Sequence, residues 1–245
     1  MSPPPLRLRA VAAGRPATDA ACAGCAQLGT LRALRKASVE IQGGIGCDLD
    51  AGRAFVAAPG RWAAVTGVAR LLREGAPALL EETARAGARL LVIADRVAPV
   101  RSTSLEHSLA RAGARVVRLD LDDLAMAEAR ARQALDVPGT VLVALSPCVR
   151  GAPRAAPLHV EARLCNRCGA CLSLACPAIS DDGEESMGVD AEICTGCGRC
   201  TPLCRSRALG PAGRAAPGLE AGYSSAAWPP ADTLASSPSP TAPPS

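Results

Sequence analysis

Residues 165–177 read Cys-Asn-Arg-Cys-Gly-Ala-Cys-Leu-Ser-Leu-Ala-Cys-Pro, and residues 194–204 read Cys-Thr-Gly-Cys-Gly-Arg-Cys-Thr-Pro-Leu-Cys. In each run the first three cysteines stand three residues apart, so one tight loop can wrap three corners of a cubane iron-sulfur cluster. Small residues between the cysteines, such as Gly169, Gly196 and Gly198, let the backbone approach the sulfurs closely. Two such runs in tandem indicate two 4Fe-4S clusters.

The ligand sets follow the interleaved pattern of two-cluster ferredoxins, in which each run lends its fourth cysteine to the other cluster. The predicted ligands of the first cluster are Cys165, Cys168, Cys171 and Cys204. The predicted ligands of the second cluster are Cys194, Cys197, Cys200 and Cys176. The first run has one extra residue before its fourth cysteine, and Arg205 stands where a proline usually follows. Neither departure removes a ligand.

Zinc sites and a disulfide scaffold are the alternatives for these eight cysteines. Zinc favours paired C-x2-C units over four-cysteine runs, and disulfides are rare in cytosolic chains. Residues 160–210 are also too few to fold on an apolar core alone. We therefore expect a small α+β domain of the bacterial two-4Fe-4S ferredoxin type over 160–210, with its clusters serving as the core.

Toward the N-terminus, short apolar runs alternate with helix-like stretches, which predicts a parallel sheet with crossover helices over residues 20–150. The expected strands are 39–42, 62–66, 90–95, 116–120 and 140–145. The expected helices are 28–37, 76–86, 104–112 and 122–135. Gly87 and Gly113 stand where the C-terminal caps of two helices would fall. The predicted class of this domain is α/β.

Composition sets the remaining boundaries. Residues 1–19 are rich in proline and arginine and are expected to be flexible, 151–159 form a linker, and 211–245 read as a disordered tail. No apolar run approaches the length of about 18 residues that a membrane span needs, so we expect a cytoplasmic protein without a membrane span. The net charge of +4 counts the thiols as neutral. Ligation of three clusters would bring it to about −2, and we expect no nucleic-acid partner.

Four further cysteines, among the twelve of the chain, lie in the predicted α/β domain: Cys22, Cys25, Cys47 and Cys148. The first two precede the first predicted helix, whereas the other two follow the first and last predicted strands. All four could therefore meet at one edge of a parallel sheet. Such a meeting suggests a third 4Fe-4S cluster, and the spacing leaves open a zinc knuckle or four unrelated thiols.

From about residue 20 to residue 209 the chain resembles the C-terminal part of the indolepyruvate ferredoxin oxidoreductase large subunit. The shared features are a C-x2-C motif, a Gly-rich segment ending in Cys47, the Pro147-Cys148 pair and a ferredoxin module with the same extra residue. The resemblance implies a thiamine-diphosphate-binding-like domain followed by the two-cluster module. Related 2-oxoacid:ferredoxin oxidoreductases hold a 4Fe-4S cluster on cysteines that match Cys22, Cys25, Cys47 and Cys148, so the resemblance favours the third cluster.

The resemblance weakens at the position of thiamine diphosphate and Mg²⁺. The family holds the metal with an aspartate after a glycine and with a downstream asparagine, whereas here Val68 follows Gly67 and Asp95 replaces the asparagine. Gly67 and Asp95 are what remains of a cofactor-binding site, and no catalytic residue is assigned. The two histidines, His107 and His159, are expected on a solvated helix and in the linker.

Three functions are compatible with these motifs. The favoured one is an iron-sulfur electron-transfer component of an indolepyruvate or 2-oxoacid:ferredoxin oxidoreductase complex, with other oxidoreductase subunits and ferredoxin or a similar electron carrier as partners. The second is a catalytic, thiamine-dependent subunit of such an oxidoreductase. The third is a non-catalytic redox-sensing or assembly protein.

Overall fold

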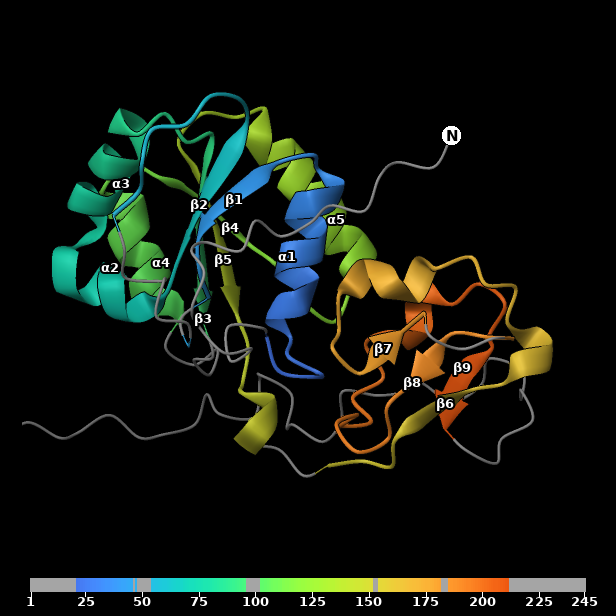
Figure 1. Cartoon of the computed structure of the whole chain (residues 1–245). Helices are drawn as coiled ribbons and strands as arrows, with labels where there is room; N and C mark the ends of the chain where they lie inside the picture. The colour runs from blue at the N-terminus through green and yellow to red at the C-terminus, as the bar shows by residue number, and fades with distance from the viewer. Residues whose placement is uncertain are drawn as a thin grey trace, which may run out of the picture.

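The computed structural model describes residues 21–45, 47, 54–95, 102–151, 154–181 and 185–211. Figure 1 shows two parts side by side, which we call the α/β region (residues 21–151) and the cysteine-rich region (residues 154–211). Among the described residues, no helix is long and apolar enough to cross a membrane.

A five-stranded parallel sheet forms the centre of the α/β region, with the strand order β1-β2-β3-β5-β4. The strands are β1 (Glu40–Gly43), β2 (Trp62–Thr66), β3 (Leu90–Asp95), β4 (Arg115–Arg118) and β5 (Thr140–Leu145). The central strands β2 and β3 are buried along their whole length, as expected for a parallel sheet covered on both faces. The α/β class predicted from the sequence is confirmed.

Helices cover both faces of this sheet (Figure 1). Helices α1 (Gln27–Lys36) and α5 (Leu124–Leu135) pack on the face that presents Ala63, Val65 and Val92. Helices α2 (Val68–Glu74), α3 (Ala76–Arg85) and α4 (Ser102–Arg111) belong to the opposite face. There, Trp62, Leu91 and Ile93 pack against α2, α3 and α4 side chains, because successive residues of a strand point to opposite faces.

The cysteine-rich region contains little regular structure. Strand β6 (Leu158–Val160) pairs antiparallel with β9 (Leu209–Pro211), and β7 (Ile179–Ser180) pairs antiparallel with β8 (Gly188–Val189). Short 3-10 turns connect them: η5 (Ala162–Leu164), η6 (Ala170–Leu174) and η7 (Thr201–Leu203), with η4 (Val149–Gly151) at the end of the α/β region. Strand β6 begins inside the segment that the sequence assigned to a linker, because the buried Leu158 packs into the core.

The core of the cysteine-rich region extends across to the α/β region. Leu158, Leu174, Met187 and Leu209 are buried there together with several cysteines. Leu28 of α1 and Leu124 of α5 pack into the same cluster, so the two regions share apolar contacts. Polar bonds supplement them: the Arg32 Nε donates to Ser173 Oγ over 3.0 Å, and Arg199 Nη1 donates to the Leu121 carbonyl over 2.7 Å.

Candidate functional site

The amino end of α1 is fixed at the carboxyl edge of the sheet by one buried side chain. Gln27 Nε2 donates to the Asp95 carbonyl at the end of β3 over 2.8 Å and to the Ala144 carbonyl in β5 over 2.7 Å. Thr30 Oγ1 in turn donates to Gln27 Oε1 over 2.8 Å, which holds the amide in this orientation. The loop that carries Cys22 and Cys25 immediately precedes α1, so Gln27 also places this loop at the carboxyl edge.

Four thiols are neighbours at this edge, and we call them the sheet-edge thiols: Cys22, Cys25, Cys47 and Cys148. Burial raises the pKa of the Cys25 thiol, the Gln27 backbone N–H lowers it, and nearby negative charge on Cys47, Cys22 or Cys148 raises it again. Gly43 is the last residue of β1, the strand that precedes Cys47. Gly43 has a positive φ of 86°, and a Cβ there would lie 2.0 Å from the Val65 carbonyl oxygen.

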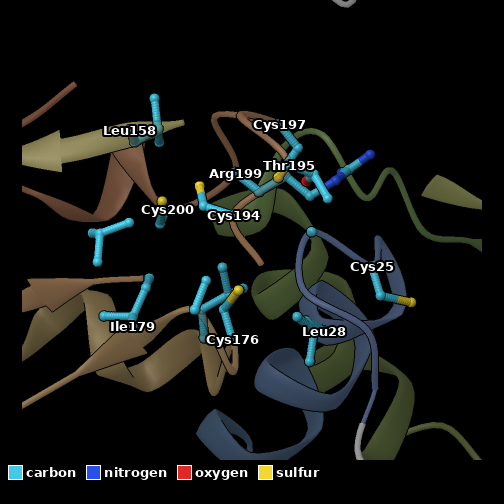
Figure 2. Close-up of a pocket in the computed structure, with 14 residues that line it drawn as sticks. Cys25, Leu28, Leu158, Cys176, Ile179, Cys194, Thr195, Cys197, Arg199 and Cys200 are labelled. Atoms are coloured by element: carbon cyan, nitrogen blue, oxygen red, sulfur yellow. The ribbon is translucent and has the colours of Figure 1, made fainter. Parts of the chain in front are cut away.

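A second group lies beside α1 in the cysteine-rich region, and we call its members the inner thiols: Cys176, Cys194, Cys197 and Cys200. They line a cavity of about 20 Å³, together with apolar side chains such as Leu28, Leu158 and Leu174 (Figure 2). Burial, with negative charge on Cys197, Cys176 or Cys194 adding to it, raises the pKa of the Cys200 thiol to about 12. These four cysteines are the second predicted ligand set.

The remaining cysteines are called the outer thiols: Cys165, Cys168, Cys171 and Cys204. Burial raises the pKa of the Cys171 thiol, backbone N–H groups lower it, and negative charge on Cys204 or Cys168 raises it further. Cys171 therefore has two of its predicted co-ligands as neighbours, and Cys165 packs against the same apolar core. Cys168 is exposed, whereas Cys171 is buried.

The Cys22–Cys25 loop reaches the inner thiols directly. Gly24 is buried with a positive φ of 76°, and a Cβ added to it would lie 2.1 Å from Thr195 Oγ1 and 3.2 Å from Cys197 Sγ. Burial raises the pKa of the Cys176 thiol, and the nearby Gly24 backbone N–H lowers it by a smaller amount. Cys25 lines the same cavity as the inner thiols, and in Figure 2 its sulfur is directed away from the Cys194 and Cys200 sulfurs.

All twelve cysteines are free, so the structure contains no disulfide scaffold. Within the described part of the chain, no group of three or more His, Cys, Asp or Glu side chains converges closely enough to hold a metal ion. Around a single zinc ion the sulfur ligands lie about 3.8 Å apart, given the length of a Zn–S bond.

The two residues predicted as the remnant of a thiamine site have structural roles. Gly67 stands at the N-cap position of α2 in an extended conformation. Asp95 is 6 % exposed, and its Oδ2 accepts a hydrogen bond of 2.7 Å from the Val68 backbone N–H in the first turn of α2. The carboxylate of Asp95 therefore supplies the cap that Gly67 cannot provide.

The histidines are not part of any of the three groups of thiols. His107 is exposed on α4, as the sequence predicted. His159 is half-buried in β6 and not in a linker, and its Nδ1 lies 3.2 Å from the Gly210 carbonyl oxygen. This position follows from the pairing of β6 with β9.

Sequence reasoning missed four residues that shape these sites: Gln27, Gly24, Thr195 and Arg199. Their contacts join segments far apart in the chain, which no local pattern reveals. The available signal was their place in the cysteine motifs, since Gly24 lies between Cys22 and Cys25 and both Thr195 and Arg199 lie within the second cysteine run. Comparison with known proteins adds no further information, because the chain matches no protein-family model, no curated protein and no solved structure.

Proposed function

We propose that this chain is an iron-sulfur electron-transfer component of an indolepyruvate or 2-oxoacid:ferredoxin oxidoreductase-type complex. The observation that carries the proposal is that the cysteines lie in separate groups of neighbours in the folded chain. The sheet-edge thiols and the inner thiols are each complete groups of four neighbours, and Cys168, Cys171 and Cys204 are neighbours among the outer thiols. These groups coincide with the three ligand sets expected for three 4Fe-4S clusters.

The residues around the inner thiols fit such a cluster in two further ways. Thr195 Oγ1 is buried and has no hydrogen-bond partner among the described residues, and cluster sulfurs accept hydrogen bonds. Gly24 brings its backbone close to the inner thiols, since a Cβ at Gly24 would lie 3.2 Å from Cys197 Sγ. When bound, the clusters would supply one-electron redox chemistry. The chain itself provides thiolates, backbone N–H donors and an apolar enclosure.

The residues at the predicted thiamine site do not fit thiamine diphosphate with Mg²⁺. Mg²⁺ needs oxygen ligands in near-octahedral geometry, and Val68 offers a side chain without oxygen. The Asp95 carboxylate is already bound to the Val68 backbone N–H at the start of α2. We therefore derive no catalytic step through this cofactor, and the electron-transfer function is preferred over the catalytic one.

The test is the iron and acid-labile sulfide content of the full chain after anaerobic purification, with electron paramagnetic resonance of the reduced protein. Three clusters correspond to about 12 iron atoms per chain. Cys25→Ala should remove the signal of one cluster, whereas the matched variant Ser146→Ala, at the same edge of the sheet, should keep all three. Stoichiometric zinc without labile sulfide would overturn the proposal.

A content of about 8 iron atoms would limit clusters to the cysteine-rich region and remove the part of the proposal that involves the sheet-edge thiols. Calorimetry on the same preparation, with thiamine diphosphate and Mg²⁺ added, distinguishes the catalytic function from the electron-transfer function. We expect no binding tighter than millimolar. Tight binding would restore the catalytic function.

A further inference from the structure

Thr195 carries a hydroxyl group whose position the fold does not explain by itself. Its Oγ1 is buried and has no hydrogen-bond partner among the described residues, although Thr195 lies at the contact between the two regions. A buried hydroxyl without a partner destabilises the folded state. The Thr195 hydroxyl would therefore be satisfied by a hydrogen-bond acceptor that binds beside it.

The inner thiols surround this hydroxyl group, which lines the same cavity as they do. Thr195 Oγ1 and Cys197 Sγ both lie within 3.2 Å of the point that a Gly24 Cβ would occupy. The same cavity is lined by Cys176, Cys194 and Cys200 (Figure 2). A hydroxyl at this place can turn its proton toward the Cys197 thiolate or toward a sulfide held among the inner thiols.

Gly24 supplies a second donor from the opposite region of the molecule. Gly24 lines the same cavity as Cys176, and its backbone N–H lies close enough to that sulfur to lower the pKa of the thiol, while its missing side chain lets the loop approach Thr195. The positive φ of 76° and the close contact both exclude a larger residue without rearrangement. A backbone donor from the α/β region and a hydroxyl donor from the cysteine-rich region therefore face the same group of sulfurs.

Hydrogen bonds to cluster sulfurs are among the factors that set the reduction potential of a cluster. Reduction adds one electron, so donors stabilise the reduced, more negative state more than the oxidised state, and they raise the potential. The structure gives no comparable pair of donors from the α/β region to the outer thiols among the described residues.

We propose that the Thr195 hydroxyl, with the Gly24 backbone N–H, is a positioning element that raises the reduction potential of the cluster held by the inner thiols. This inference rests on the proposed function. It adds that the contact between the two regions changes the reduction potential of the cluster on the inner thiols (the inner cluster). The cluster on the outer thiols (the outer cluster) should keep its potential and so serves as a reference within the same protein.

The experiment is a redox titration of the full chain, followed by electron paramagnetic resonance, on the wild type, Thr195→Val and Thr195→Ser. Valine keeps the shape but removes the donor, whereas serine keeps the donor. We expect Thr195→Val to lower the potential of the inner cluster, Thr195→Ser to keep it near the wild-type value, and the outer cluster to stay unchanged in both.

An unchanged inner potential in Thr195→Val at full iron content would overturn the inference and leave the proposed function intact. Equal shifts in Thr195→Val and Thr195→Ser would also overturn it. A wild-type chain without iron and sulfide would instead refute the proposed function. If Thr195→Val fails to assemble the inner cluster, electron-nuclear double resonance of the reduced wild type decides: exchangeable protons coupled to the inner cluster are expected, and their absence contradicts the inference.

Discussion

The Cys200 thiol is buried, and its pKa of about 12 lies above its ordinary value of 9.0. Burial is the main cause, and negative charge on Cys197, Cys176 or Cys194 adds to it. Since a metal ligand must be deprotonated, binding of iron must overcome this preference for the neutral thiol. In the metal-free protein the same preference stabilises the folded state, because the buried Cys200 thiol stays protonated.

The first prediction concerns the pH dependence of the metal-free chain. A group whose pKa is raised on folding contributes stability that is present below the unfolded pKa and lost as the pH rises through the folded pKa. The free energy of unfolding should therefore fall between pH 9.0 and about pH 12. Urea unfolding at several pH values in this window measures it, and Cys200→Ala should show a shallower fall. Equal slopes in both proteins would contradict the attribution to Cys200.

Individual residues of the sites were predictable only where local spacing carries the information. The cysteine runs follow from their three-residue spacing, so the ligand sets could be written from the sequence. The contacts of Gln27 span 68 and 117 residues, and the bond from the Val68 N–H to Asp95 spans 27 residues. No local pattern contains such pairs, so the sequence could not predict that Asp95 caps α2.

Among the elements, α2 depends most on a residue outside itself. It has seven residues and no cap from its own side chains, so the Asp95 carboxylate accepts the hydrogen bond that a local cap would accept. By contrast, α5 is capped locally, because the exposed Asp123 side chain accepts from the Met126 N–H over 2.9 Å. These two helices therefore offer a matched comparison of a buried and an exposed cap.

The second prediction compares Asp95→Ala with Asp123→Ala. Asp95→Ala leaves the buried Val68 N–H without its acceptor, and we expect the free energy of unfolding to fall by about 2 kcal/mol, even though removing a buried charge offsets part of the loss. Asp123→Ala should cost about 1 kcal/mol, because water can replace an exposed cap. Urea unfolding of both variants measures the difference. A larger loss in Asp123→Ala would contradict the role assigned to Asp95.

Helices and strands could be predicted where their own residues carry the pattern that defines them. Strands β2, β3 and β5 have the predicted bounds, because continuous apolar runs mark strands buried on both faces. The edge strand β4 ends earlier than predicted, since Leu119 and Asp120 lie beyond its ladder. Helix α2 was missed altogether, because it is short and its cap comes from β3.

At the scale of the whole molecule, the two regions are held together by a shared apolar core and a few polar bonds. Arg199 is the principal polar link, with Nη1 donating to the Leu121 carbonyl and to Asp122 Oδ1, each over 2.7 Å. The residue stands between the inner thiols Cys197 and Cys200. The bonds of Arg199 therefore tie the inner cysteine loop to the segment before α5.

The third prediction concerns this link. Arg199→Met keeps the apolar stem but removes both donors, and we expect the contact between the regions to weaken by about 1–2 kcal/mol. Hydrogen exchange measured by mass spectrometry should become faster in residues 121–124 and in the inner cysteine loop. Arg163→Met is the matched control, because Arg163 is 88 % exposed and forms an ion pair with Glu161, two residues away in the chain. Equal protection in Arg199→Met and the wild type would refute the link.

The pairing of β6 with β9 brings the two ends of the cysteine-rich region close together. Leu158 lies opposite Pro211 and Val160 lies opposite Leu209, so the chain enters and leaves this region at neighbouring points. Segments whose ends lie close together can be inserted into a surface loop of another protein without stretching the host. The pairing of β6 with β9 therefore makes residues 158–211, about 54 residues, suitable for insertion into another protein. The host would have to offer apolar contacts like those of Leu28 and Leu124.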